Sequence, residues 1–142
     1  MTENQVNQVV EKWLTLKGFR YKGVNKSRKL AKDNINVGQV PIPDGSRQVL
    51  IDHQGIKDKP IDLIWVEAKG SDVGMSKLLE GFARVGYACY CGGGKGLLAV
   101  PDAEFTQLLE TLPKGYLVAI TKASERAMGL LNIETGIVEW LS

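Results

Sequence analysis

The sequence predicts one mixed α/β domain in which helices cover a central sheet. Its length of 142 residues fits a single domain. Apolar patterns of helical and strand type follow one another in the order helix, three-strand meander, helix, strand, helix, strand and C-terminal hairpin. No repeat, low-complexity tract or internal linker divides the chain, so residues 1–142 are expected to fold as one unit.

The first half of the chain contains the first helix and the meander. Apolar residues recur at helical spacing over residues 3–17, and Gly18 is suited to end that helix. A basic connection is expected at 19–34. Three strands should follow it over residues 36–42, 48–56 and 61–69, separated by turns at 43–46 and 57–60. The third strand is apolar on both faces, which is typical of the centre of a sheet.

The second half alternates shorter elements. A helix is expected over residues 75–85 because its apolar residues share one helical face. Short apolar runs predict strands at 87–91 and 97–100 around a glycine loop, and Asp102 can cap a helix that continues to Leu112. A strand at 116–121 and a hairpin formed by residues 128–133 and 137–141 complete the prediction.

Composition restricts the classes of protein that the chain can represent. No apolar run approaches the roughly 18 residues that a membrane helix needs, and the first residues are polar and lack a signal-peptide core. Cys89 and Cys91 are the only cysteines, and on a strand they lie too close together to form a comfortable disulfide. We therefore expect a cytoplasmic protein without membrane contact or a disulfide framework.

Positive charge is concentrated near the N-terminus, although the net charge is only +2. Eight basic residues and no acidic residue lie between Lys12 and Lys32. Such a block is a possible footprint for nucleic acid, and a solvated loop explains it equally well. The candidate nucleic-acid contacts are Lys22, Lys26, Arg28, Lys29 and Lys32.

Charged residues at the end of the third expected strand are the main functional signal. Glu67 and Lys69 share a strand face with Trp65, because side chains alternate along a strand. Asp52 follows an apolar run in the preceding strand, and a hairpin would bring it within cross-strand reach of Glu67. Two carboxylates so placed repel unless a cation lies between them, and their hard oxygens suit Mg²⁺. Glu3, on the inner edge of the first helix, could add another carboxylate.

These residues resemble the motif of the PD-(D/E)xK nuclease superfamily, whose core runs helix, three-strand meander, helix, strand. The segment "VEAKG" supplies Glu67 and Lys69, "VLIDHQ" supplies Asp52, and the helix that opens the domain supplies Glu3. The resemblance covers about residues 2–121. It implies a restriction-endonuclease-like fold, in which a mixed central sheet is flanked by helices. The literal Pro-Asp pair of this chain ends in Asp44, which is the alternative to Asp52.

The resemblance also implies an activity, the metal-dependent hydrolysis of DNA by an endonuclease. Asp52, Glu67 and the backbone carbonyl of Ala68 would hold Mg²⁺ or Mn²⁺, and Lys69 would orient the attacking water or stabilise the transition state. Many enzymes of this fold act as homodimers, so a homodimer is expected by analogy. The alternative function is that of a catalytically inactive subunit that binds nucleic acid or serves in assembly.

Overall fold

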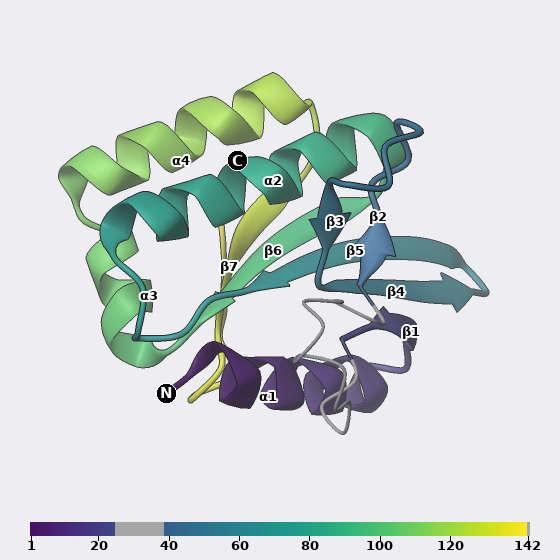
Figure 1. Cartoon of the computed structure of the whole chain (residues 1–142), viewed down its shortest axis with the longest axis horizontal. Helices are drawn as coiled ribbons and strands as arrows, with labels where there is room; N and C mark the ends of the chain where they lie inside the picture. The colour runs from purple at the N-terminus through teal and green to yellow at the C-terminus, as the bar shows by residue number, and fades with distance from the viewer. Residues whose placement is uncertain (25–38, 142) are drawn as a thin grey trace.

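The computed structural model describes residues 1–24 and 39–141. These residues form a six-stranded mixed sheet in the order β1-β4-β5-β6-β7-β8, together with a small two-stranded sheet (Figure 1). The strands of the large sheet are β1 (Arg20–Gly23), β4 (His53–Asp58), β5 (Ile61–Ala68), β6 (Lys95–Val100), β7 (Met128–Asn132) and β8 (Val138–Trp140). The small sheet pairs β2 (Val40–Pro41) with β3 (Leu50–Ile51).

Strand directions divide the large sheet into an antiparallel and a parallel part. β1, β4 and β5 form an antiparallel meander, and β6 and β7 run parallel to β5. β8 pairs antiparallel with β7, as the predicted hairpin requires. β5 thus lies inside the sheet with a neighbour on either side, which agrees with its apolar character on both faces.

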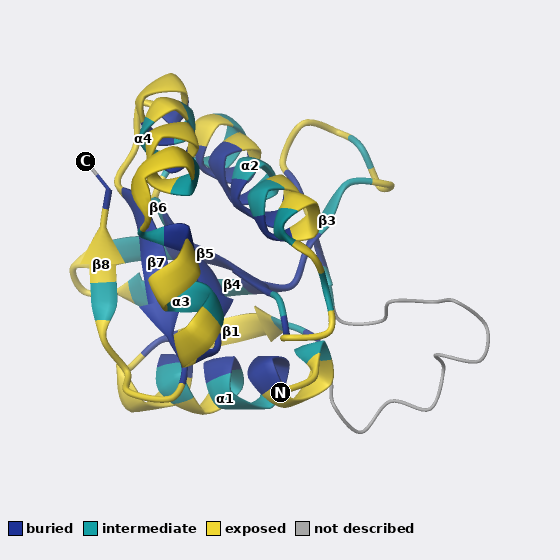
Figure 2. Ribbon diagram, turned by 90° about the vertical axis from the view of Figure 1, so that its left-hand side faces the viewer, coloured by how far each residue is buried: buried dark blue, intermediate teal, exposed yellow. Residues whose placement is uncertain are grey.

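Helices cover both faces of this sheet, so the predicted fold class is confirmed. The described residues form four helices, α1 (Glu3–Leu16), α2 (Met75–Gly92), α3 (Asp102–Leu108) and α4 (Thr111–Ser124). α1 lies on one face, whereas α2 and α4 lie side by side over the other, each with its buried side turned inward (Figures 1 and 2). No helix of the described residues is long and apolar enough to cross a membrane.

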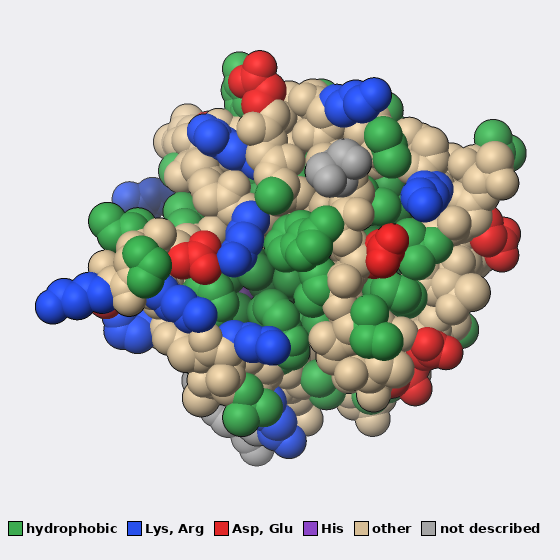
Figure 3. Space-filling view, turned by 180° about the vertical axis from the view of Figure 1, so that it is seen from behind, with side chains coloured by type: hydrophobic (Ala, Val, Ile, Leu, Met, Phe, Trp, Pro, Cys, Tyr) green, Lys and Arg blue, Asp and Glu red, His purple; other side chains and the backbone are tan. Residues whose placement is uncertain are grey.

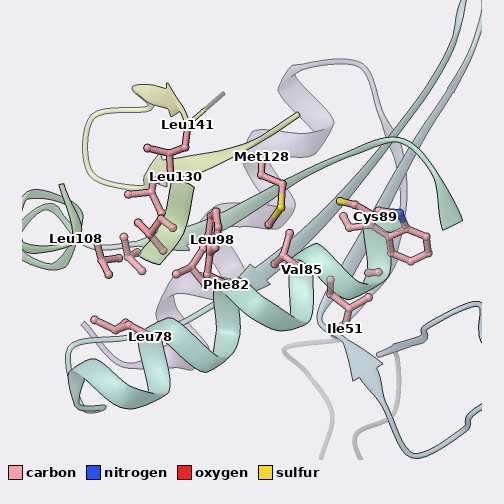
Figure 4. Close-up of a cluster of buried hydrophobic side chains, with 14 of the residues drawn as sticks. Ile51, Leu78, Phe82, Val85, Cys89, Leu98, Leu108, Met128, Leu130 and Leu141 are labelled. Atoms are coloured by element: carbon pink, nitrogen blue, oxygen red, sulfur yellow. The ribbon is translucent and has the colours of Figure 1, made fainter. Parts of the chain in front are cut away.

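Two hydrophobic cores follow from the alternation along β5. Ile64 and Val66 face α1 and pack with Val10 and Leu14. Trp65 faces the other way and joins the core beneath α2. In that second core the side chains of α2 lie against those of β6 and β7, as the close-up in Figure 4 shows.

The N-terminus of α1 is fixed beside the end of β5. Thr2 and Gln5 form a reciprocal capping box, with the Gln5 backbone N–H donating to Thr2 Oγ1 at 3.2 Å and the Thr2 N–H donating to Gln5 Oε1 at 2.9 Å. The loop after β5 then reaches this end of the helix, where the Ser71 N–H donates to the carbonyl of Met1 at 2.7 Å. A Cβ on Gly70 would lie 2.5 Å from the backbone nitrogen of Glu3, so this approach requires glycine.

The meander differs from the prediction in its first strand. Within the expected strand 36–42, the described residues from 39 onward contribute only the two residues of β2, which belong to the small sheet. The large sheet instead uses β1, inside the region expected to be a basic connection. The expected strand 48–56 is likewise divided at Asp52 into β3 and β4, and each part joins a different sheet.

Two expected strands in the second half are helical instead. Residues 87–91 continue α2 to Gly92, because Ala88 and Cys89 extend the buried face that runs from Leu78 to Val85. Residues 116–121 lie inside α4, which buries Leu117 and, four residues on, Thr121. Short apolar runs cannot by themselves distinguish a strand from a helix. In the structure both segments belong to long helices, α2 and α4, which pack on each other. The expected strand at 97–100 and the helix beginning at Asp102 are confirmed, the latter ending at Leu108 instead of Leu112.

Candidate active site

Asp52 and Glu67 meet at the junction between the small sheet and the large one. His53 pairs with Val66, so Asp52, the residue before β4, lies opposite Glu67. The Asp52 backbone N–H donates to Glu67 Oε1 at 3.0 Å, and the Ala68 N–H donates to Asp52 Oδ2 at 2.9 Å. Both acids are buried, with 3% of Asp52 and 2% of Glu67 exposed, so neither carboxylate is a solvated strand end.

The remaining carboxylate oxygens also have partners. Gln39 Nε2 donates to Asp52 Oδ1 at 2.7 Å. From α2, Arg84 Nη1 reaches Glu67 Oε2 at 3.4 Å. The pair is therefore held by four hydrogen bonds, two from the backbone and two from side chains.

Burial and mutual repulsion control the charge of this pair. The pKa of Glu67 is raised well above the ordinary value of 4.5, first because burial disfavours the carboxylate and second because Asp52 lies beside it. The Asp52 N–H and the positive charges of Arg84 and Lys69 oppose that rise without cancelling it. Glu67 thus remains protonated to a higher pH than an exposed glutamate would.

Lys69 extends the site toward α1. Its backbone N–H donates to the Ala99 carbonyl at 3.0 Å, which keeps it in register with β6. Its ammonium lies 3.5 Å from Glu3 Oε1. The pKa of Glu3 is raised by burial and by the charge of Asp52, and Lys69 partly offsets that rise. All four residues predicted from the motif therefore lie at the same end of the sheet.

Glycine makes room for the lysine. A Cβ built on Gly81 of α2 would lie 3.1 Å from Lys69 Cε and 3.2 Å from Leu98 Cδ1. The bare helix backbone at Gly81 thus lets the alkyl part of Lys69 pass between α2 and the sheet, which leaves only 17% of its side chain exposed.

The donor set fits a hard divalent cation that is only partly held by protein. Mg²⁺ commonly binds through one or two carboxylates and keeps waters or substrate phosphates as its other ligands. Asp52 and Glu67 offer two such carboxylates, and a cation there would relieve the repulsion that raises the pKa of Glu67. Within residues 1–24 and 39–141, no group of three or more His, Cys, Asp or Glu residues is arranged to hold a metal. Glu3 contacts Lys69 instead of completing such a group.

The other predicted residues lie elsewhere. Asp44 is in an exposed turn, where its carboxylate accepts from the Ser46 N–H at 2.7 Å and from the Tyr87 hydroxyl. These hydrogen bonds lower the pKa of Asp44. The carboxylate that contacts the end of β5 is that of Asp52.

The predicted nucleic-acid contacts fall mostly outside the described part of the chain. Lys22 lies in β1 and is exposed. Lys26, Arg28, Lys29 and Lys32 lie outside the described residues.

Sequence reasoning missed three residues that shape the site, Gln39, Arg84 and Gly81. Arg84 lies three residues after Gly81 and next to the buried Val85, at the edge of the face that α2 buries. That position was a usable signal, since an edge residue of a packed helix can reach a strand end. Gln39 gave no such signal, because it precedes a strand of only two residues.

The fold and the site define a mixed α/β domain with two buried carboxylates and a lysine at the end of a central strand. No family model matches the chain, and no curated protein was found to be similar to it. Among solved structures, the chain is similar to an XisH family protein from Nostoc punctiforme, with a TM-score of 0.51 and 16% sequence identity. The similarity covers 96% of this chain and 98% of that one. It therefore extends over the whole domain, and at this identity it supports the fold alone.

Proposed function

We propose that this protein is a metal-dependent DNA endonuclease of the PD-(D/E)xK type. The observation that carries the proposal is the buried contact between Asp52 and Glu67, with Lys69 at the same strand end. A buried acid pair is costly to maintain, so it calls for a reason beyond stability. The element order on which the motif depends, a helix, an antiparallel meander, a helix and a parallel strand, is present in the fold.

In this proposal each residue has a distinct task. Asp52 and Glu67, together with the carbonyl of Ala68, would hold Mg²⁺ or Mn²⁺. The ion would supply Lewis acidity and acidify a bound water. Lys69 would place positive charge beside the phosphate or orient the water. Glu3 would position the ammonium of Lys69 through the observed ion pair.

A second candidate is a catalytically inactive subunit that binds nucleic acid or serves in assembly. It is favoured by the bonding of the acid pair, since all four carboxylate oxygens already accept hydrogen bonds. A metal would have to share these oxygens with the hydrogen-bond donors that already occupy one lone pair of each, or displace Gln39 and Arg84. Both candidates share DNA as the expected partner, based on the basic block from Lys12 to Lys32. A homodimer and a cytoplasmic location belong to the same proposal.

Cleavage of plasmid DNA in Mg²⁺ or Mn²⁺ tests the first candidate, with Asp52→Asn and Asp44→Asn as a matched pair. Asp52→Asn should lower the cleavage rate by about 100-fold or more, because even residues behind the metal ligands typically contribute 10–100-fold. Asp44→Asn should cleave as the wild type does, since Asp44 lies in an exposed turn. Circular dichroism would establish that both variants are folded.

The outcomes separate the two candidates. A wild-type protein that binds duplex DNA but cleaves neither plasmid nor branched DNA supports the inactive subunit. Wild-type rates in folded Asp52→Asn protein would rule out the proposed site. Calorimetric titration with Mg²⁺ gives a readout without cleavage, in which Asp52→Asn should bind the ion at least about 10-fold more weakly.

A further inference from the structure

A groove combining aromatic and lysine side chains lies on the α1 side of the sheet, toward the end away from Glu67 and Lys69. It has a volume of about 210 Å³ and crosses from β4 to β8. Its lining includes three aromatic residues and three lysines, which are Trp13, Phe19, Trp140, Lys17, Lys57 and Lys95. Figure 3 shows this side of the molecule, where Lys and Arg side chains gather around a hydrophobic hollow. We call these six residues the aromatic–lysine groove.

The ammonium groups lie close to the aromatic rings. Lys57 Nζ is 4.5 Å from the centroid of the Phe19 ring, and Lys95 Nζ is 5.9 Å from the same centroid. Lys17 Nζ is 5.9 Å from the centroid of a Trp13 ring. Each contact holds a cation at the groove without neutralising it, because a ring carries no net charge.

Among the residues that the structure describes, the groove has an excess of positive charge without an ion-pair partner. Asp62 is the one acid among the described residues that line it, and it pairs with Lys95 at 2.9 Å. Within the described part of the chain, neither Lys17 nor Lys57 forms an ion pair. Two ammonium groups are therefore available to an anionic ligand.

The aromatic residues offer surfaces of another kind. Trp140 is 43% exposed, and its ring lies over Gly129, whose added Cβ would meet it at 3.1 Å. Trp13 is half-buried on the same groove. An exposed indole beside unpaired ammonium groups suits a ligand with planar rings and phosphates, because bases stack on aromatic rings while lysines follow the backbone.

The size of the groove indicates part of a chain rather than a small metabolite. Pockets that enclose small molecules measure roughly 300–1,000 Å³, and this groove is smaller and open at the surface. It has room for a base or two of a longer strand, with the phosphates passing over Lys17 and Lys57.

We propose that the aromatic–lysine groove binds single-stranded nucleic acid, with bases stacked on Trp140 and Trp13 and phosphates on Lys17 and Lys57. The groove is separate from the acid pair. Ile64 lines it on the α1 face, whereas Glu67 lies three residues further along β5 and contacts Arg84 of α2 on the opposite face. This inference therefore does not rest on the endonuclease activity, and it holds for an active or an inactive protein.

Binding of a fluorescently labelled oligothymidylate, measured by anisotropy in a metal chelator, tests the proposal. Trp140→Leu keeps an apolar side chain over Gly129 but removes the stacking ring, and it should weaken binding by about 5- to 150-fold. The exposed Tyr90→Leu on α2 is the matched control and should leave the affinity unchanged.

Salt dependence tests the lysines separately, and it stays informative even if Trp140→Leu fails to fold. The double variant Lys17→Ala, Lys57→Ala should flatten the slope of log K against log salt by up to about 1.4, since each phosphate contact to a single strand contributes about 0.7. Lys77→Ala, Lys114→Ala removes two lysines outside the groove and should not change the slope.

Three results would overturn the proposal. One is a folded Trp140→Leu protein with wild-type affinity, and another is an unchanged salt slope in the Lys17, Lys57 variant. The third is equal competition by polyglutamate, which would show a site for acidic peptides or polyanions in general. Repeating the titration with Asp52→Asn keeps the two proposals distinguishable, because that variant should bind the oligonucleotide as the wild type does.

Discussion

Replacing Glu67 by Gln should stabilise the protein relative to the wild type progressively as the pH rises. Burial and the neighbouring Asp52 raise the pKa of Glu67 in the folded protein well above 4.5, whereas in the unfolded chain it ionises near that ordinary value. Between these two pKa values the folded state holds a proton that the unfolded state has lost. The free energy of unfolding of the wild type therefore falls as the pH rises through this window.

The size of this stability effect follows from a single proton, the one that the folded state keeps on Glu67. One extra proton in the folded state corresponds to a slope of about 1.4 kcal/mol per pH unit. Glutamine cannot ionise, and its Oε1 can still accept the Asp52 N–H that Glu67 accepts at 3.0 Å. The stability difference between Glu67→Gln and the wild type should thus widen by up to about 1.4 kcal/mol per pH unit. It should stop widening above the folded pKa of Glu67.

Measured on the wild type alone, the effect of Glu67 on stability is masked by the titration of His53. Burial lowers its pKa from 6.5 to about 4, so between those values the unfolded state holds the extra proton and stability rises with pH. Where the two windows overlap, above pH 4.5, the slopes from His53 and Glu67 have opposite signs. A wild-type curve that is nearly flat there would be consistent with both, and only the difference from the variant isolates Glu67.

Urea denaturation at a series of pH values from 4.5 upward provides the assay. Glu80→Gln is the control, because it removes a half-exposed carboxylate of α2 that also lies near Arg84, at 4.0 Å. The free energy of unfolding of this control should change with pH as that of the wild type does. Parallel curves for Glu67→Gln and the wild type would refute the reasoning, since they would show that Glu67 ionises alike in the folded and unfolded states.

The remaining predictions concern other parts of the molecule. His53→Gln should remove a stability gain of about 3 kcal/mol between pH 4 and 6.5, visible as a growing deficit against the wild type in the same urea series. Phe82→Ala should lower the free energy of unfolding by about 3–5 kcal/mol, because Phe82 is fully buried in the core of Figure 4. Tyr90→Ala, on the exposed side of α2, is the control. Gly81→Ala should keep the free energy of unfolding within about 1 kcal/mol of the wild-type value. The added methyl group should displace Lys69, so that cleavage slows while the affinity for Mg²⁺ does not change. An unchanged cleavage rate would contradict this expectation.

The sequence was most informative where burial leaves a strong pattern. β5 was recognisable because it is apolar on both faces, and α1 because its apolar residues recur at helical spacing. Turn residues between β4 and β5 then gave the register that brings Asp52 to Glu67. α1 contains Glu3 and β5 contains Glu67, while Lys69 directly follows β5 and Asp52 directly precedes β4. The position of the motif residues in or beside these elements explains why that part of the site was predictable.

Elements that depend on tertiary contacts could not be predicted in the same way. β1 has three exposed residues in succession and no apolar alternation, so its sequence resembles a loop. It is a strand because the outer edge of β4 is available and because Gly23 allows close approach; a Cβ there would lie 2.4 Å from the Asp52 carbonyl. The end of α2 is similar, since residues 87–91 are helical through their packing.

The interruption at Asp52 connects the fold to the candidate chemistry. The chain leaves the small sheet at Ile51 and enters the large one at His53, so Asp52 is free of regular pairing between them. Its backbone carbonyl accepts the Val24 N–H at 3.0 Å, and its N–H turns to the Glu67 carboxylate. A residue in an unbroken strand would use that N–H in the sheet ladder. The same break that directs the N–H of Asp52 to Glu67 also lets the Asp52 side chain accept from the Ala68 N–H. These two hydrogen bonds are how two acids come to share one buried site. An acid that ends an apolar run, opposite a second acid on a central strand, is thus a pattern worth searching for in other chains of this fold.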